Sequence, residues 1–411
     1  MAEAEGAPDD IAFGTEAEWA AVHDCYGPST STPRTLKRLF SPDEKTRKNA
    51  ISWLYAALFH QGGRFEATIK AAPLVIEIAL HPALPPDARR FLCEYIVSLA
   101  YGFAEELPYR GVFPPDHLAL LDEAKTGKWR EMSEAARQIE RYCDRWVARD
   151  LYRAIIARRA ALYPLIEHEN ASVAAAARIA LSLLAADDPA FRARFEALLG
   201  RETADLASTG APAEIEPAVS LIIGAATMAR AARIAAPEAL LGPWLEAAAP
   251  RLRFAAAIAL AEPDRIDRFR APLIDGLTTP TVRGARTPVH QVWTSLEALA
   301  LGLVEDALAD APEARTALWL DAFAANLDAP DTDRALKSTS MILNLLSPSR
   351  TKRFADTPAS ALTPLQRRGL EAIRDRGFWS VAGGAFLNFT QLIGAYGLPE
   401  TKEGLSDYLD P

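Results

Sequence analysis

Residues 33–60 have the sequence PRTLKRLFSPDEKTRKNAISWLYAALFH, and residues 73–101 have the sequence PLVIEIALHPALPPDARRFLCEYIVSLAY. Each stretch begins with a proline and a short apolar segment, passes through a turn rich in proline and aspartate, and ends in a segment with apolar residues three or four positions apart. That spacing is typical of one face of an amphipathic helix. The second stretch begins 40 residues after the first, so the sequence predicts a repeated pair of helices.

The rest of the chain carries the same pattern in weaker form. Apolar segments after Pro164, Pro243 and Pro272 each lead into a turn and a further basic or apolar segment. Thr15-Glu16-Ala17-Glu18 and Thr363-Pro364-Leu365-Gln366 have the residues of a capping box at a helix N-terminus. No segment combines sustained alternation of apolar and polar residues with the tight turns of a hairpin. The sequence therefore predicts an all-α fold.

These helix pairs resemble the repeats of HEAT proteins, an armadillo-like class with a unit of about 40–47 residues. The resemblance rests on prolines that would open first helices, on turn residues and on arginines after the turns: Pro33, Pro73, Pro164, Pro243 and Pro272; Asp43, Asp87 and Asn170; Arg47, Arg89 and Arg251. Tyr26-Gly27, and His60-Gln61-Gly62 with Arg64 and Glu66-Ala67, also resemble segments of uncharacterised bacterial HEAT-repeat proteins. The resemblance implies a right-handed α-solenoid with irregular insertions.

The length of 411 residues exceeds the roughly 250–300 residues of one globular core, so several domains or a repeat array are required. We expect a disordered acidic tail over residues 1–14, a single solenoid over residues 15–400 and a C-terminal cap or tail over residues 401–411. One unusually long helix is expected over about residues 128–160. Three long connections, rich in proline, glycine or threonine, are expected as loops at residues 105–117, 200–217 and 278–288.

Charge and hydropathy narrow the class of protein. The chain has 45 basic and 54 acidic residues, a net charge of -9, which disfavours a general nucleic-acid binder. A hydrophobic content of 50% excludes wholesale disorder. The uncharged segment Phe378–Leu398 is interrupted by polar residues and glycines, so we expect buried terminal helices there and no membrane span. Three widely spaced cysteines and an acidic N-terminus without a secretory signal favour a cytoplasmic location.

Residues 60–66 are the first candidate binding site. Two glycines permit close approach of the backbone, and the side chains of His60, Gln61, Arg64 and Glu66 crowd one turn between expected helices. Turns of this kind line the binding groove of a solenoid, so these four residues are predicted to contact a partner. The alternative is a glycine C-cap in which Arg64 and Glu66 pair with neighbouring repeats.

Arginines at four-residue spacing on the predicted long helix are the second candidate. Residues 129–160 contain eight arginines and five acidic residues, a local charge of +3. Arginine suits the recognition of carboxylates and phosphates, so this stripe could bind an acidic partner. A solvated face with ion pairs such as Glu140 with Arg137 is the favoured alternative. The predicted partner-binding residues of the stripe are Arg137, Arg141, Arg145 and Arg149.

A catalytic alternative rests on Asp150, which follows Trp146 by four residues on the expected apolar face. A carboxylate in that position is a helix break, a buried partner for an arginine, or a catalytic group with a perturbed pKa. The spacing resembles the Trp and Asp of HEAT-like alkylpurine DNA glycosylases, which implies an enzyme acting on damaged DNA. No metal-ligand spacing, phosphate-binding loop, dinucleotide fingerprint or serine nucleophile motif is present in the sequence, so no cofactor or metal is expected.

The sequence thus favours a non-catalytic scaffold that binds a protein or peptide in a concave groove. A bacterial regulatory or immunity-type protein would fit this class. The alternative is the glycosylase-type enzyme, with Asp150 and Trp146 as its site residues and nucleic acid as its partner.

Overall fold

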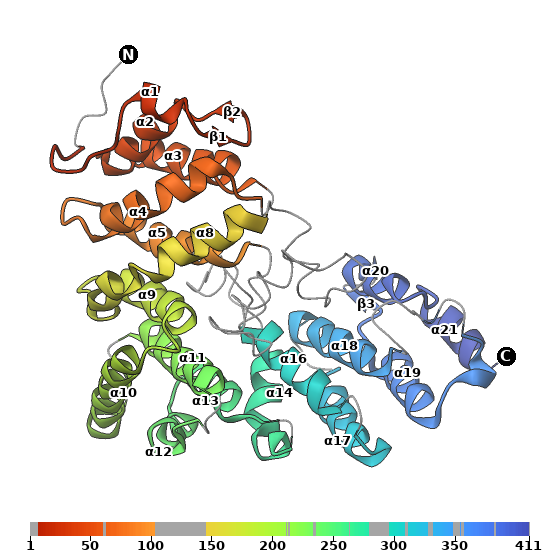
Figure 1. Ribbon diagram of the computed structural model, residues 1–411. Helices are drawn as coiled ribbons and strands as arrows, with labels where there is room; N and C mark the ends of the chain where they lie inside the picture. Colours follow the sequence, from red (N-terminus) through yellow and green to blue (C-terminus); the bar gives the residue numbers. More distant parts are fainter. Residues whose placement is uncertain are drawn as a thin grey trace. The chain divides into compact units, whose positions relative to one another are not determined.

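A computed structural model of the protein describes most of the chain. The described residues are 7–60, 63–102, 145–210, 212, 214–232, 236–262, 264–278, 296–308, 311–327, 332–347, 354, 357–381 and 384–410. They are helical apart from short connections and two hairpins, which confirms the predicted all-α class (Figure 1). They form two compact units, the first ending at Ala259 and the second beginning at Leu260, where the sequence suggested one body.

The first unit begins with a short helix, a hairpin and a helical pair. These elements are α1 Glu16–Trp19, β1 His23–Asp24, β2 Gly27–Pro28, α2 Thr32–Lys37 with its 3₁₀ extension η1 Arg38–Phe40, and α3 Glu44–Ala57. The predicted capping box starts α1, because the Thr15 hydroxyl accepts the Glu18 N–H and the Glu18 carboxylate accepts the Thr15 N–H. Asp43 caps α3 by accepting the Thr46 N–H at 2.9 Å. Carboxylate and hydroxyl caps therefore set these helix starts.

The remainder of the first unit consists of helices packed in pairs. These are α4 Glu66–Leu80, α5 Pro86–Tyr101, α8 Arg145–Ile156, η6 Arg159–Glu167, α9 Ala171–Leu184, α10 Pro189–Thr209, α11 Ile215–Ala232, α12 Glu238–Leu241, η7 Gly242–Glu246 and α13 Pro250–Leu260. Helix α4 packs on α5, η6 on α9 and α10 on α11. The second helices also pack in succession, α5 on α9 and α9 on α11, so they form the core of the unit.

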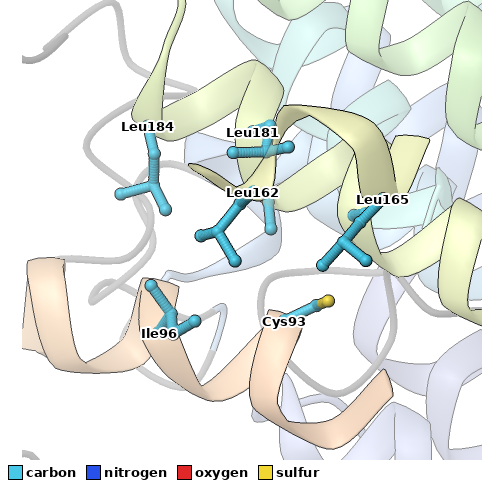
Figure 2. Close-up of a pocket in the computed structure, with 8 residues that line it drawn as sticks. Cys93, Ile96, Leu162, Leu165, Leu181 and Leu184 are labelled. Carbon is cyan, nitrogen blue, oxygen red and sulfur yellow. The ribbon is translucent and has the colours of Figure 1, made fainter. Parts of the chain in front are cut away.

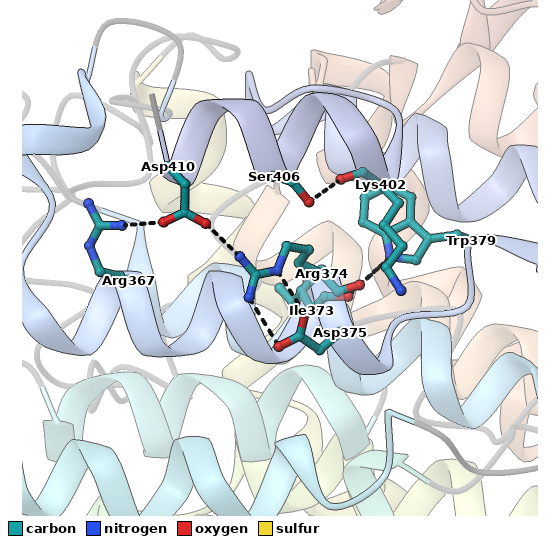
Figure 3. A network of polar contacts seen from close by, with 8 residues as sticks. All are labelled: Arg367, Ile373, Arg374, Asp375, Trp379, Lys402, Ser406 and Asp410. Atoms are coloured by element: carbon teal, nitrogen blue, oxygen red, sulfur yellow. Dashed lines mark hydrogen bonds and ion pairs between the residues drawn. The ribbon is translucent and has the colours of Figure 1, made fainter.

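The second unit is also built mainly of helices, which are joined by different connections. Its elements are η8 Ile266–Phe269, α14 Arg270–Thr278, α16 Leu296–Leu308, α17 Glu313–Ala324, α18 Thr332–Leu346, η10 Ala359–Ala361, α19 Pro364–Arg376, β3 Ser380–Val381, β4 Gly384–Ala385, α20 Leu387–Ala395 and α21 Lys402–Leu409. Helices α17, α18 and α19 pack on one another, and α19 packs on α21. Arg374 joins α19 to the end of α21 through Asp410 at 3.1 Å (Figure 3). The buried Trp319, Phe323 and Leu370 fill this unit's interior.

The N-terminal end of the described chain is more ordered than expected. Ile11 and Phe13 are buried, and the Phe13 carbonyl accepts the indole N–H of Trp19 at 2.8 Å. The expected tail over residues 1–14 is therefore too long, because these two apolar residues interrupt its acidic run. At the other end, where a cap or a tail was expected, Thr401 caps α21 by accepting the Gly404 N–H, and α21 packs on α19.

The expected loops and long helix also differ from the structure. The segment 200–217 is helical up to Thr209 and again from Ile215, because apolar residues with helical spacing continue across it. Within the expected helix 128–160, α8 ends at Ile156 and a separate 3₁₀ helix begins at Arg159. Thr278 is the last residue of α14. Residues 105–117, 128–144 and 279–288 lie outside the described residues.

Proline opens only some of the helices for which it was expected. Pro33 lies in the first turn of α2 and Pro243 in that of η7. Pro73 lies inside α4 and Pro164 inside η6. In α4 the buried residues Ala67, Thr68, Ala71 and Ala72 precede the proline, so burial of this face extends the helix toward its N-terminus. Tertiary packing thus outweighs the loss of one backbone hydrogen bond at proline.

Candidate functional site

The hairpin β1–β2 was not expected from the sequence. Each of its strands has two residues, with His23 opposite Pro28 and Asp24 opposite Gly27, which is too short for visible alternation. The buried Asp24 carboxylate accepts the Tyr26 N–H and the Ser29 hydroxyl, both at 2.8 Å. Gly27 has a φ of 119°, a conformation that favours glycine. These contacts fix the conformation of the hairpin tip.

The hairpin lies against the turn that follows α3. The Cys25 N–H donates to the carbonyl of Ala57 at 3.0 Å, and β1 packs on α4. In the turn, the Thr68 hydroxyl accepts the Phe65 N–H and donates to the carbonyl of Leu58 at 2.7 Å. One hydroxyl therefore ties the start of α4 to the end of α3.

Four side chains gather where the hairpin meets this turn: His23, Tyr26, His60 and Glu66, which we call the hairpin surface. The Tyr26 ring is 68% exposed and lies edge-on to His60, with ring centroids 6.0 Å apart. His60 Nδ1 is 3.0 Å from the carbonyl of Ala56, to which it donates. His23 Nδ1 lies 3.8 Å from the Glu66 carboxylate, and both side chains are exposed.

The hairpin surface joins two segments that the sequence singled out separately. Tyr26 comes from one of them, and His60 and Glu66 come from the other. No sequence spacing indicates that His23 meets Glu66, since 43 positions separate them. Gln61 lies outside the described residues.

Arg64 is not part of the hairpin surface. Its side chain is buried, and Nη1 donates to the carbonyls of Leu99 at 3.3 Å and Ala100 at 3.0 Å. A cation beside the last carbonyls of α5 complements the negative end of that helix. Gly102, with a φ of 63°, leaves room for the guanidinium, since a Cβ there would lie 2.8 Å from Nη2. Arg64 therefore joins the start of α4 to the end of α5.

The arginine stripe is only partly described. Arg137 and Arg141 lie outside the described residues, and Arg145 and Trp146 belong to α8 without described side chains. Arg149 Nε binds the Asp150 carboxylate at 3.0 Å. The Asp150 side chain is 41% exposed.

The buried face of α8 differs from the expected one. It consists of Val147, Ala148, Leu151, Tyr152 and Ile155. Asp150 lies beside this face, contrary to the expectation of an acid in the middle of an apolar stripe.

Titratable groups are buried elsewhere on α5. Burial raises the pKa of the Glu94 carboxyl to about 7, although Arg90 Nε lies 3.0 Å away and opposes the shift. Burial also raises the pKa of the Cys93 thiol to about 12, so this cysteine stays protonated and unreactive. Cys93 lines a small apolar cavity with Ile96, Leu162 and Leu165 (Figure 2). No three His, Cys, Asp or Glu side chains in the described part of the chain are arranged to hold a metal ion.

Two further observations concern membrane spans and similarity to other proteins. None of the described helices combines the length and the apolar run that crossing a bilayer requires. The chain matches no protein-family model, and a search of curated proteins gives no significant match.

Proposed function

We propose that this protein is a non-catalytic α-helical repeat scaffold of the HEAT type that binds a protein or peptide partner at the hairpin surface. Recurrent arginine contacts support the repeat. Arg47 of α3 and Arg253 of α13 each donate through Nη1 to the carbonyls six and five residues earlier in the preceding turn. Arg47 Nε also binds the carboxylate of Asp87, 40 residues along the chain, which links α3 to α5.

The exposure of Tyr26 carries the proposal for the site. Among the large hydrophobic residues that the structure describes, Tyr26 is the most exposed. Its backbone is held by Asp24 and the Gly27 turn, so this part of the surface is already formed before a partner arrives. Tyrosine is enriched among residues that dominate binding energy, and a preordered backbone loses less entropy on binding.

The charge of the surface favours a basic segment as the ligand. Glu66 presents an exposed carboxylate near the hairpin, and the chain as a whole carries -9. A lysine or arginine side chain can pair with a carboxylate and can also stack on an aromatic face. We therefore expect the bound segment to carry at least one such residue.

Site-specific photocrosslinking tests this function. A photoreactive phenylalanine analogue replaces Tyr26 in the full chain, and irradiation in the native lysate should give a discrete protein adduct. Leu387, a similarly exposed residue at 65%, provides the matched control position and should not give that adduct. Excess wild-type protein should suppress the adduct, whereas the Y26A variant should not. The variant E66Q should reduce the yield several-fold.

Two outcomes would contradict the proposal. Identical adducts from position 26 and position 387 would mean that capture depends on exposure alone. If excess Y26A protein suppressed the adduct as strongly as excess wild-type protein does, Tyr26 would not belong to the binding surface.

A further inference from the structure

Two histidines occupy equivalent turns in the first unit. His81 ends α4 and His168 ends η6, and each donates its backbone N–H to a carbonyl three residues earlier. In each ring, Nδ1 faces the backbone N–H two residues further on: Ala83 at 3.2 Å from His81, and Asn170 at 2.9 Å from His168. The backbone thus presents both imidazoles in the same way.

The two rings differ at the other nitrogen. His81 Nε2 lies 3.2 Å from the carboxylate of Asp10, which accepts a hydrogen bond. His168 Nε2 lies 2.5 Å from Nη1 of Arg89, and a guanidinium can only donate. Both ring nitrogens of His168 therefore face N–H donors, and a neutral ring can accept from only one of them, which is Arg89 at Nε2 when the ring proton is on Nδ1.

Neither donor is free to move away from His168. Arg89 is buried, and its Nη2 donates to the carbonyls of His81 at 2.6 Å and Leu84 at 3.2 Å. The Asn170 backbone is held because its side chain caps α9, accepting the N–H groups of Ser172 and Val173. Arg89 therefore links the turn before α5 to the turn before α9 through the His168 ring.

Protonation is incompatible with this arrangement. A neutral imidazole has one nitrogen that can accept a hydrogen bond, and a protonated imidazole has none. A proton on His168 would also put a second positive charge beside Arg89. Burial and Arg89 lower the pKa of His168, in that order, while Glu169 and the backbone hydrogen bond with Asn170 oppose the shift. The neighbouring Glu167 is already bound by Arg194 and Arg201 of α10.

We propose that the contact between Arg89 and His168 is an acid-labile joint between the helical pair α4–α5 and the pair η6–α9. The joint holds when His168 is neutral and opens when the ring takes up a proton. It goes beyond the proposed binding function, because none of its residues belongs to the hairpin surface. His81 Nε2 faces a carboxylate in place of a guanidinium, so His81 provides a matched comparison position.

The sign of the pH dependence follows from the direction of the pKa shift. The folded-state pKa of His168 lies below the ordinary value of 6.5. The contact is therefore fully present above pH 6.5 and is lost as the pH falls through the folded-state pKa. Between pH 6.5 and that folded-state pKa, each unit of falling pH increases the opening equilibrium by up to about tenfold, because the opened ring binds a proton that the closed ring does not; at lower pH the dependence levels off.

Hydrogen exchange of the full chain between pH 7.5 and 5 tests the joint. Rates are corrected for the pH dependence of exchange itself, and peptides spanning residues 168–174 should lose protection as the pH falls. The variant H168Q should show no such pH dependence, and the matched variant H81Q should keep the wild-type profile. A pH dependence that survives in H168Q, or a flat wild-type profile, would overturn the proposal.

A second measurement needs no variant that could misfold. The imidazole signals of selectively labelled wild-type protein can be followed by NMR across the same pH range. The pKa of His168 should lie below the ordinary value of 6.5. Titration of His168 at or above the ordinary value would show that Arg89 does not oppose its protonation, and the joint would be excluded.

Discussion

The two units differ in whether charged side chains are buried in their cores. Every charged residue that is buried in the described part of the chain belongs to the first unit: Asp24, Arg64, Arg89, Glu94 and Arg178. Several described arginines of the second unit instead form partly exposed pairs with aspartates, such as Arg315 with Asp267 and Arg334 with Asp275. In the described part of the chain, the first unit therefore has charge in its core as well as at its surface, and the second has it outside its core.

This difference predicts different responses to mutation and to salt. The three buried arginines donate mainly to backbone carbonyls, so each one joins helix ends and turns that are distant in sequence. Removing one leaves buried acceptors without donors, which is costly. Exposed ion pairs are screened by salt and contribute about 0–1 kcal/mol. Four substitutions, in order of decreasing effect, can test the contrast.

Removal of Arg178 should have the largest effect. This side chain is 5% exposed and donates to the carbonyl of Ile166 from Nε and to that of Pro217 from Nη1, both at 2.9 Å. We expect R178A to lower the free energy of unfolding by about 4 kcal/mol, measured by urea denaturation. The exposed Arg201 is the control, and R201A should cost at most about 0.5 kcal/mol. Equal costs would remove the contrast between buried and exposed arginines.

Glu94 should make the first unit less stable as the pH rises. Its folded-state pKa of about 7 exceeds the ordinary 4.5, so between these values the folded protein keeps a proton that the unfolded chain releases. The free energy of unfolding should therefore fall by up to about 3 kcal/mol across this window. The variant E94Q removes this contribution, so urea denaturation of both proteins at several pH values isolates it. If the free energies of unfolding of the wild type and E94Q changed in parallel with pH, Glu94 would not be a buried neutral carboxyl.

Loss of Asp267 should be the largest of the surface effects in the second unit. Its carboxylate accepts the Trp319 indole N–H at 2.8 Å and binds Arg315 Nε at 2.7 Å. Because the Trp319 ring is buried, D267A leaves its donor unpaired, and we expect a cost of about 2 kcal/mol. Faster amide hydrogen exchange in α17 should reveal this loss of stability. D275A, which removes the contact with Arg334 at 3.2 Å, should cost less, and the reverse order would contradict this assignment.

Arg374 should matter least. It pairs with Asp375 at 2.7 Å and Asp410 at 3.1 Å on the surface of the second unit (Figure 3). We expect R374A to cost about 0.5 kcal/mol or less, and we expect 1 M salt to abolish the difference. Urea denaturation at low and high salt provides the measurement. A cost above about 2 kcal/mol that persists in high salt would mean that exposed pairs are as important as buried ones here.

Local signals in the sequence predicted the helices well. Thr15 and Thr363 each form the capping box that their spacing indicates, and Asn170 caps α9 as a turn residue should. Helix boundaries were less predictable where burial decides them. Pro73 lies inside α4 because the apolar face continues on both sides of it, and no local rule at proline reveals that continuation.

The candidate site was predictable only in part. The sequence identified His60 and Glu66 as a crowded turn, but the approach of Tyr26 and His23 depends on tertiary contacts of a two-residue strand. Arg64 was predicted to contact a partner because it follows two glycines in a turn with several polar residues. Its burial depends on the end of α5, 35 residues away, which sequence spacing alone does not show.

The cavity beside Cys93 should make the junction between α5 and α9 sensitive to pressure. Its lining comes from α5, η6 and α9, the same elements that meet at the contact between Arg89 and His168 (Figure 2). Hydrostatic pressure favours states in which such internal voids have been eliminated. Compression should therefore weaken this junction at neutral pH, where His168 is uncharged, and so separate its packing from its electrostatics.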